Sequence, residues 1–553
     1  MKKNIGKLIF FCLLSFLFSQ EIDVKPEENL NDSSEVNKVA EESTDSENNT
    51  ETENIELEDE SQKETSEIII SHKPGVSEVP EEKRPKTPSD ERIKELDSTG
   101  EDNREKNTET LKFGMESDIL DLLDELIKNE DVRFVNEVYD LFQETKSFVV
   151  REKILSFFTN IEDPCLEDFA IIVINDPYDE KLSTVNAVFR YIQTIKTKVA
   201  IPAILTLIEN ESEEYFNGAL TTLGAIGGPE EAVYLTGFLD REDLTVAQKQ
   251  QLVKVLGQIK AVETYDKLVE MAEDNEENAF IRMYSAEAIG SMGKEEAVEV
   301  LVNLYEDTDP KIREYVIRGL KNYKDNEVAE KIMLQATRDN HYKVRLEAIE
   351  AIKVNEIKSA VPYLIYRAKN DPENVVKKSA WPVIASLNTN EGNEFLVNQI
   401  KDKKIPDNTK SIVAKSLLEY NNAGSEEIIE LAKETLKDDK RKPLRYALGK
   451  EFAKYKRDEY ADLCVLYIAN KDVATQGTGL DIYAKGRYAS AESEIEKLIL
   501  TAAKDTKKRN VNAIKAEKIL GKENDIVKHA EKIKEESKKQ EEEKKNKKNA
   551  NAK

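Results

Sequence analysis

Apolar residues recur with helical spacing through most of this 553-residue chain. Between residues 116 and 500 they lie three and four positions apart, as Ile119, Leu122, Leu123 and Leu126 do at the start of the region. This spacing places them on one face of a helix, and polar turns separate one short helical segment from the next. The pattern predicts an all-α fold.

The helical segments repeat with a period of about 31 residues. The clearest unit consists of one amphipathic helix, Ile281–Gly290, a short turn and a second helix, Glu296–Tyr305. The first-helix pattern returns in Asp309–Leu320 and in Val344–Ile352. Neither short helix can bury its apolar face alone, so neighbouring units must stack. We therefore predict an α-solenoid of about eleven two-helix units, irregular at both ends.

These units resemble HEAT-like repeats of the short, phycobilisome-lyase type. The resemblance covers roughly residues 116–500 and implies a solenoid of a kind that serves as scaffold or adaptor and, in a few cases, as an enzyme. It is carried by a hydrophobic-Arg start, a glycine after the apolar stripe, an Ala-Val-x-x-Leu second helix and an acidic turn. The matching residues are Ile281, Arg282, Ala286, Ala288, Ile289, Gly290, Ala297, Val298, Leu301, Asp307 and Asp309.

Several residues in the repeat have a predicted structural role. We expect Gly290 and Gly293 to allow a tight helix-to-helix turn, because glycine adopts positive φ without steric cost. In Asp309-Pro310 the aspartate is expected to cap a helix whose first residue is the proline. Arg313 and Arg345 are expected to pair with aspartates of neighbouring turns and so to set the stacking angle.

The N-terminus has the pattern of an export signal. Met1–Ser19 begins with lysines, continues with an apolar run of about eleven residues and ends on a small residue. We predict a secretory signal peptide cleaved after Ser19, and hence a periplasmic or envelope-associated protein. The alternatives are a lipoprotein signal modified at Cys12, which the large residues before that cysteine disfavour, and an uncleaved anchor.

Two charged segments flank the predicted solenoid at residues 111–503. Residues 20–110 carry 29 acidic and 11 basic side chains and almost no aromatic ones, which predicts a disordered acidic linker. Residues 504–553 have a net charge of +7 and are predicted to form a charged tail, helical or disordered, without an apolar stripe for packing. Its last lysines suggest weak contact with an anionic membrane surface.

The composition argues against nucleic-acid binding and most catalytic chemistry. The net charge is −28, whereas nucleic-acid binding requires a basic surface. The chain has three histidines, and only His341 lies in the repeat region, so histidine-based catalysis has little material. No metal-ligand spacing or cofactor motif was recognised, and we predict no cofactor. Cys165 and Cys464 lie too many units apart for a disulfide and are expected to be free and buried.

One irregular region stands out between residues 360 and 387. On the helix that begins at residue 360, Tyr363, Tyr366 and Arg367 are predicted to project off the apolar face. The only tryptophan, Trp381, precedes a proline within the next helix, where proline is expected to introduce a kink. Exposed aromatic and arginine side chains are typical of protein-binding hot spots. These four residues are the predicted partner-binding site; the alternative is that the tyrosines pack between repeats.

The sequence thus favours a non-catalytic scaffold or adaptor of the bacterial cell envelope. Its solenoid would bind a protein partner along a long concave surface, and the acidic arm would act as a tether. One alternative is a surface-exposed envelope factor that binds like an adhesin. Another is a lyase-like or chaperone protein that handles a ligand, which would require a pocket with converging polar groups.

Overall fold

The computed structural model describes residues 73–99, 103–210, 214–241, 243–505 and 509–551. In these residues the regular secondary structure is entirely helical, which confirms the predicted all-α fold. The predicted signal peptide, its cleavage after Ser19 and residues 20–72 of the linker lie outside the described residues. No helix in the described part is long and apolar enough to cross a membrane.

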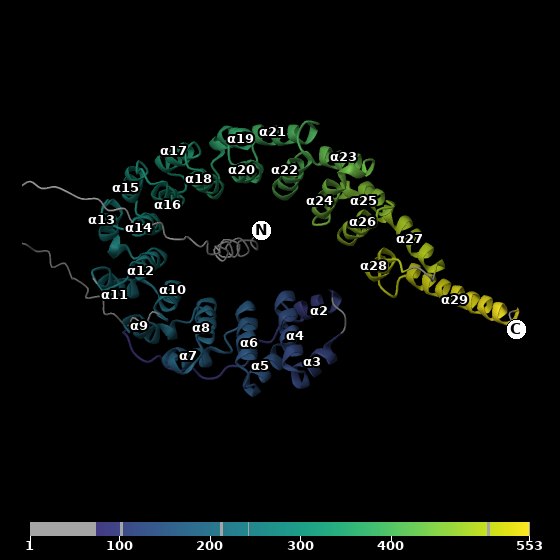
Figure 1. Cartoon of the computed structure of the whole chain (residues 1–553), viewed down its shortest axis with the longest axis horizontal. Helices are drawn as coiled ribbons and strands as arrows, with labels where there is room; N and C mark the ends of the chain where they lie inside the picture. Colours follow the sequence, from purple (N-terminus) through teal and green to yellow (C-terminus); the bar gives the residue numbers. More distant parts are fainter. Residues whose placement is uncertain (1–72, 100–102, 211–213, 242, 506–508, 552–553) are drawn as a thin grey trace, which may run out of the picture. The chain divides into compact units, whose positions relative to one another are not determined.

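The helices form pairs, and the pairs stack side by side. The second helix of each pair contacts the second helix of the next pair, so these helices form one continuous layer (Figure 1). We call this the even layer, after its labels. It contains α4 (Glu116–Asn129), α6 (Phe148–Asn160), α8 (Leu182–Ile195), α10 (Phe216–Ile226), α12 (Val246–Gln258), α14 (Ala279–Met292), α16 (Pro310–Leu320), α18 (Tyr342–Asn355), α20 (Asn374–Leu387), α22 (Asp407–Tyr420), α24 (Lys442–Phe452), α26 (Val473–Gly486) and α28 (Val511–Leu520).

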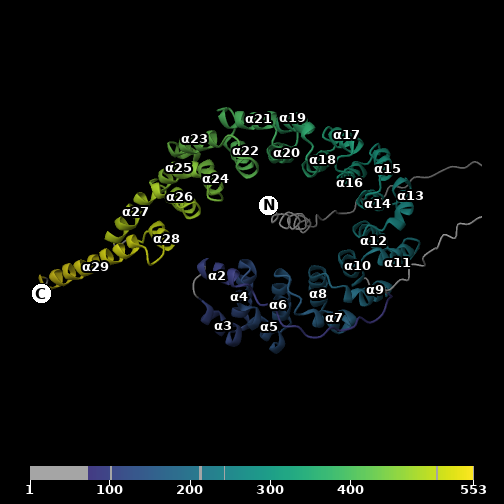
Figure 2. The same ribbon diagram turned by 180° about the vertical axis from the view of Figure 1, so that it is seen from behind.

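The first helices of the pairs form the second layer, the odd layer, visible from both sides in Figures 1 and 2. In the described residues the pairs run from α3–α4 to α27–α28 and number thirteen, whereas the repeat pattern predicted about eleven units. The odd layer contains α3 (Arg104–Phe113), α5 (Val135–Glu144), α7 (Glu167–Asn175), α9 (Ile201–Glu209), α11 (Pro229–Leu239), α13 (Tyr265–Glu273), α15 (Ala297–Leu304), α17 (Glu327–Ala336), α19 (Val361–Asn370), α21 (Asn390–Lys401), α23 (Ser425–Leu436), α25 (Ala461–Ile468) and α27 (Glu492–Lys504).

The capping residues behave largely as the sequence predicts. Asp309 caps α16 by accepting a hydrogen bond from the Lys311 backbone N–H, and Pro310 is the first helical residue. Gly293 ends α14 with a φ of 74°. The prediction that Gly290 lies in the turn is wrong, because Gly290 lies inside α14. Its missing Cβ matters for packing, because a Cβ there would lie 2.3 Å from the Cα of Gly319 on α16.

Two arginine–aspartate pairs, one half-buried and one buried, connect successive turns. Arg313 makes a bidentate contact with Asp339 at 2.8 and 2.9 Å, and Arg345 makes the same contact with Asp371 at 2.8 and 2.7 Å. Both arginines also donate to carbonyls in the turn that precedes their own helix, those of Asp307 and Asp339. The predicted pairing with neighbouring turns is therefore confirmed. Removing one partner of such a pair leaves an uncompensated charge, which makes the register between repeats specific.

Residues 73–89 differ from the predicted linker. They form an extended segment, the strap, that lies on the odd layer. Ser77 exchanges backbone hydrogen bonds with the Asn175 side-chain amide at 2.8 and 2.9 Å, and the Lys86 N–H donates to Asp163 at 2.7 Å. Glu82 accepts a hydrogen bond from the buried Tyr139 hydroxyl. Polar side chains of the helices thus hold the strap in place. The sequence prediction of packed segments depended on an apolar stripe, which the strap does not have.

The helices α2 (Asp90–Thr99) and α3 also fall within the predicted linker, and two more helices fall within the predicted tail. In the tail, α28 packs against α26 and α27, and α29 (Asp525–Asn551) packs against α27. The buried side chains are small, as at Ala516 and Ala530, so the apolar stripe is too narrow to stand out among the lysines. Cys165 and Cys464 are free and buried, as predicted.

Candidate functional site: a groove between α17 and α19

Three of the four predicted binding residues lie together at an open groove. Tyr363, Tyr366 and Arg367 of α19 line it together with Pro362, and the end of α17 contributes Thr337 and Arg338. The groove has a volume of about 640 Å³. Pro362 follows a short 3₁₀ helix at residues 358–360 and occupies the second position of α19, so the groove is built on a helix N-terminus.

The aromatic side chains of the groove carry cations on their faces. The Arg338 guanidinium lies 4.8 Å from the centre of the Tyr363 ring, and Arg367 lies 4.7 Å from that of Tyr366. Tyr363 is half-buried, whereas Tyr366 is 55% exposed. Cation–π contact of this kind holds an arginine in place without neutralising it. The groove therefore presents flat aromatic surface and positive charge side by side.

The two arginines of the groove differ in their acidic contacts. Arg367 lies 3.2 Å from Asp371, which is fully buried and also binds Arg345. Burial by itself would raise the pKa of Asp371, but hydrogen bonds from Arg345 and the Glu373 N–H outweigh it and lower that pKa. Two guanidinium groups thus share one carboxylate. Arg338 is exposed and contacts the Tyr363 ring, and no carboxylate is among the groove's lining residues.

Trp381, the fourth predicted residue, is not part of this groove. It is 6% exposed and stacks on Phe395 of α21, with ring centres 5.5 Å apart. Pro382 lies inside α20, which is a single helix from Asn374 to Leu387. Trp381 thus fills the space between α20 and α21, and we leave it out of the candidate site. The sequence pattern identified an unusual helix but not the direction of its largest side chain.

Arg338 is the groove residue that sequence reasoning missed. It lies two residues beyond the end of α17, in a turn where arginine is usually read as a helix-end charge. One signal was available in the sequence. Arg338 stands directly before Asp339, and because Asp339 pairs with Arg313, Arg338 has to find another contact. Only the stacking of repeats shows that Arg338 faces Tyr363 of the next pair.

With this geometry in hand, the chain can be compared with known proteins. The family model described as "Spirochaete HEAT repeat protein" matches residues 111–519. The chain belongs to this family. No curated protein shows a significant match. The family match confirms the HEAT-like repeats and extends them to α28, beyond the boundary at residue 503 that the sequence pattern predicted.

Several solved structures are similar to this chain at low identity and low TM-score. The phycocyanin lyase complex of CpcE and CpcF from Nostoc sp. PCC7120 is 14% identical, with 55% of this chain and 94% of that chain covered and a TM-score of 0.26. Kap121p is 11% identical, with 75% of this chain and 52% of that chain covered and a TM-score of 0.35. The karyopherin Kap121p bound to the extreme C-terminus of the protein phosphatase Cdc14p is also 11% identical. The match covers 78% of this chain and 55% of that chain, with a TM-score of 0.35. The chain thus spans about half the length of Kap121p.

The even layer of this HEAT repeat protein carries a second group of aromatic and charged residues, but they are paired with one another. Tyr284 and Tyr315 pack edge to face, with ring centres 5.3 Å apart. Lys254 lies 4.1 Å from the Tyr284 ring, and Arg318 lies 4.3 Å from the Tyr315 ring. Arg318 also binds Glu347 at 3.1 Å. These contacts join four successive even-layer helices, so we interpret them as structural.

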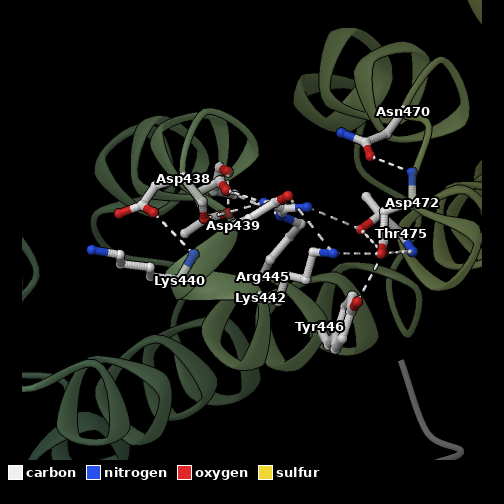
Figure 3. A network of polar contacts seen from close by, with 11 residues as sticks. Asp438, Asp439, Lys440, Lys442, Arg445, Tyr446, Asn470, Asp472 and Thr475 are labelled. Atoms are coloured by element: carbon white, nitrogen blue, oxygen red, sulfur yellow. Dashed lines mark hydrogen bonds and ion pairs between the residues drawn. The ribbon is translucent and has the colours of Figure 1, made fainter.

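A polar network at α24–α26 is also structural (Figure 3). Buried Arg445 donates to the Thr435 carbonyl at 3.0 Å, and its other side reaches Thr475 at 3.4 Å. Asp472 accepts from Thr475 and Tyr446, both at 2.8 Å. Burial disfavours the Asp472 carboxylate, but these hydrogen bonds outweigh it and lower the pKa of Asp472. The network thus connects α24 of one repeat to the start of α26 in the next.

The glycine-rich stretch Thr475–Leu480 lies inside α26. Its glycines allow close packing, since a Cβ on Gly479 would lie 2.6 Å from the Ile468 backbone nitrogen. Among the described residues, no group of three or more histidine, cysteine, aspartate or glutamate side chains is arranged to hold a metal ion. The groove between α17 and α19 is therefore the site on which we build.

Proposed function

We propose that this HEAT repeat protein is a non-catalytic interaction scaffold that binds a protein partner at the groove between α17 and α19. The observation that carries the proposal is the exposed Tyr366 in a groove that Arg338 and Arg367 also line. Aromatic and arginine side chains supply most of the binding energy in protein interfaces. The buried Asp371 holds the Arg367 side chain at 3.2 Å, which reduces the ordering entropy that this side chain loses on binding.

We further propose that binding takes place outside the cytoplasm, in the bacterial cell envelope. The support for this location is the sequence pattern of Met1–Ser19. Cell fractionation and protease treatment of intact and permeabilised cells test it. Protein found in the cytoplasmic fraction with an intact N-terminus would contradict the location and leave the binding proposal standing.

Crosslinking in cells followed by pull-down tests the binding proposal. The test variant is Tyr363→Ala/Tyr366→Ala/Arg367→Ala in the full chain. The control variant is Tyr178→Ala/Tyr420→Ala, which removes two exposed tyrosines outside the groove. We expect a partner that the native chain and the control retain and the triple variant loses. A partner retained by all three proteins would overturn the assignment of the groove.

A further inference from the structure

The strap shows how an extended segment can bind the odd layer. Its Gly75 N–H donates to the Pro202 carbonyl at 3.2 Å, and the Thr206 hydroxyl donates to the Gly75 carbonyl at 3.0 Å. The Ala203 N–H donates to the Ser77 hydroxyl at 3.1 Å. The Ala203 N–H is one of the first N–H groups of α9, which lack acceptors within the helix, and it is satisfied by the Ser77 hydroxyl. The Gly75 backbone binds beside it, at Pro202 and at Thr206 in the second turn. An extended segment thus binds along the first two turns of an odd-layer helix.

The helix α19 has the same local construction as α9. In each case a short 3₁₀ helix of the pattern Lys-x-Ala precedes the α-helix, at residues 198–200 and 358–360. An apolar residue and a proline then open the helix, as Ile201-Pro202 and Val361-Pro362. Counting from the proline, Tyr363 takes the place of Ala203, and Tyr366 takes the place of Thr206. The face of α9 that the strap occupies thus corresponds to the face of α19 that lines the groove.

The two faces differ in how far they are covered. Pro202 is half-buried and Ala203 is buried, and the strap lies against both. Pro362 is exposed and Tyr366 is 55% exposed. The groove on α19 therefore has the construction of a strap-binding face without a strap in the described part of the chain.

The charge of the groove specifies the chemistry of its occupant. Arg338 and Arg367 line it, and no glutamate or aspartate does. Arg367 is already paired with the buried Asp371, so the exposed Arg338 is the main cation offered to an occupant. The N-terminus of α19 adds partial positive charge at the same end. We infer that the groove binds an extended acidic segment of a partner protein, docked across the start of α19 as the strap docks across the start of α9. This inference rests on the proposed function and specifies the kind of partner.

A defined peptide tests the inference. The probe is a fluorescent peptide with the sequence of residues 51–60 of this chain, Glu-Thr-Glu-Asn-Ile-Glu-Leu-Glu-Asp-Glu, which is acidic and contains two apolar side chains. Its control has glutamine and asparagine in place of the acidic residues. We expect the full chain to bind the acidic peptide and the control peptide at least about tenfold more weakly, with affinity falling as salt is raised.

Two arginine variants locate the peptide. Arg338→Gln is expected to weaken binding by at least about fivefold. Arg241→Gln is its matched control, because Arg241 also follows an odd-layer helix by two residues and lies over a ring, that of Phe238, but is paired with Asp243. Arg241→Gln is expected to leave the affinity unchanged. Equal losses in both variants would show binding governed by net charge and would overturn the inference.

A further outcome separates this inference from the proposed function. If neither peptide binds, while the crosslinked partner is still lost from the triple variant at residues 363, 366 and 367, the groove binds a protein but not an extended acidic segment. The inference is then wrong and the scaffold function stands. If peptide binding and partner capture are both absent, the groove has no binding function and both proposals fail.

Discussion

Replacing Gly290 by alanine should separate two helices that the structure packs backbone to backbone. A Cβ at this position would lie 2.3 Å from the Gly319 Cα and 2.6 Å from the Gly319 carbonyl carbon. Ordinary contact distances begin near 3.4 Å, so α14 and α16 would have to move apart by roughly 1 Å. A backbone atom cannot turn aside as a long side chain can.

The neighbouring helix limits how far α14 can move. On its other side, α14 also packs closely against α12, where a Cβ on Gly257 would lie 2.8 Å from the Ala288 Cα. Strain from overpacking costs typically about 1–3 kcal/mol. Because α14 is confined on both sides, we expect Gly290→Ala to lower the free energy of unfolding by about 2–3 kcal/mol.

Urea unfolding followed by far-UV circular dichroism measures this effect. Stacked repeats need not unfold as one unit, so hydrogen exchange of the α14 and α16 amides provides a local second readout. The matched control is Gly237→Ala in α11, where a Cβ meets nothing within 4 Å. It should stabilise the protein by about 0.5–1 kcal/mol. A Gly290→Ala variant as stable as the native chain, with unchanged exchange in α14 and α16, would refute the reasoning.

Three further predictions follow from buried ionisable groups. Asp371→Ala should cost about 3 kcal/mol because it leaves the buried Arg345 without its carboxylate, whereas Asp243→Ala at an exposed pair should leave the melting temperature unchanged. The pKa of Asp339 is lowered, since hydrogen bonds from its arginine partner outweigh the effect of burial. Its stabilisation is therefore complete above the unfolded-state pKa of about 3.9 and is lost as pH falls further. The difference in melting temperature between the native chain and Asp339→Asn should be constant from about pH 7 to 5 and shrink below about pH 4; a difference that already shrinks between about pH 7 and 5 would contradict this. Burial raises the pKa of Cys464 to about 12, so this thiol should react with a disulfide reagent only on unfolding in urea, and rapid reaction in the native protein would contradict its burial.

The sequence predicted those features that depend on spacing along the chain. The 31-residue period was enough for the stacked pairs, and the position of Arg313 and Arg345 at the start of their helices was enough for their pairing with turn aspartates. Tyr366 was correctly expected to be exposed, because it lies off the apolar face of α19. In each case the local helical geometry determines the result.

The features that were missed depend on contacts between repeats or on polar side chains. The sequence predicted a turn role for Gly290. Its actual role is the close approach to Gly319 on another helix, and a contact between residues of different helices leaves no sign in the local sequence pattern. The strap has no apolar stripe that would distinguish it from the predicted linker, because Asn175 holds it through hydrogen bonds to the Ser77 backbone. Arg338 could not be predicted as a groove residue, because the ring that it contacts, Tyr363, belongs to the next repeat.

Site-specific photo-crosslinking tests the central claim most directly. A photoreactive phenylalanine analogue is placed at position 366 in the groove or at position 178, where the native tyrosines are 55% and 58% exposed. The account predicts a discrete crosslinked protein from position 366 and none of the same mass from position 178. The crosslink should weaken when Arg338→Gln is introduced. The same adducts from both positions, or none from position 366, would contradict the claim that the groove between α17 and α19 binds a partner.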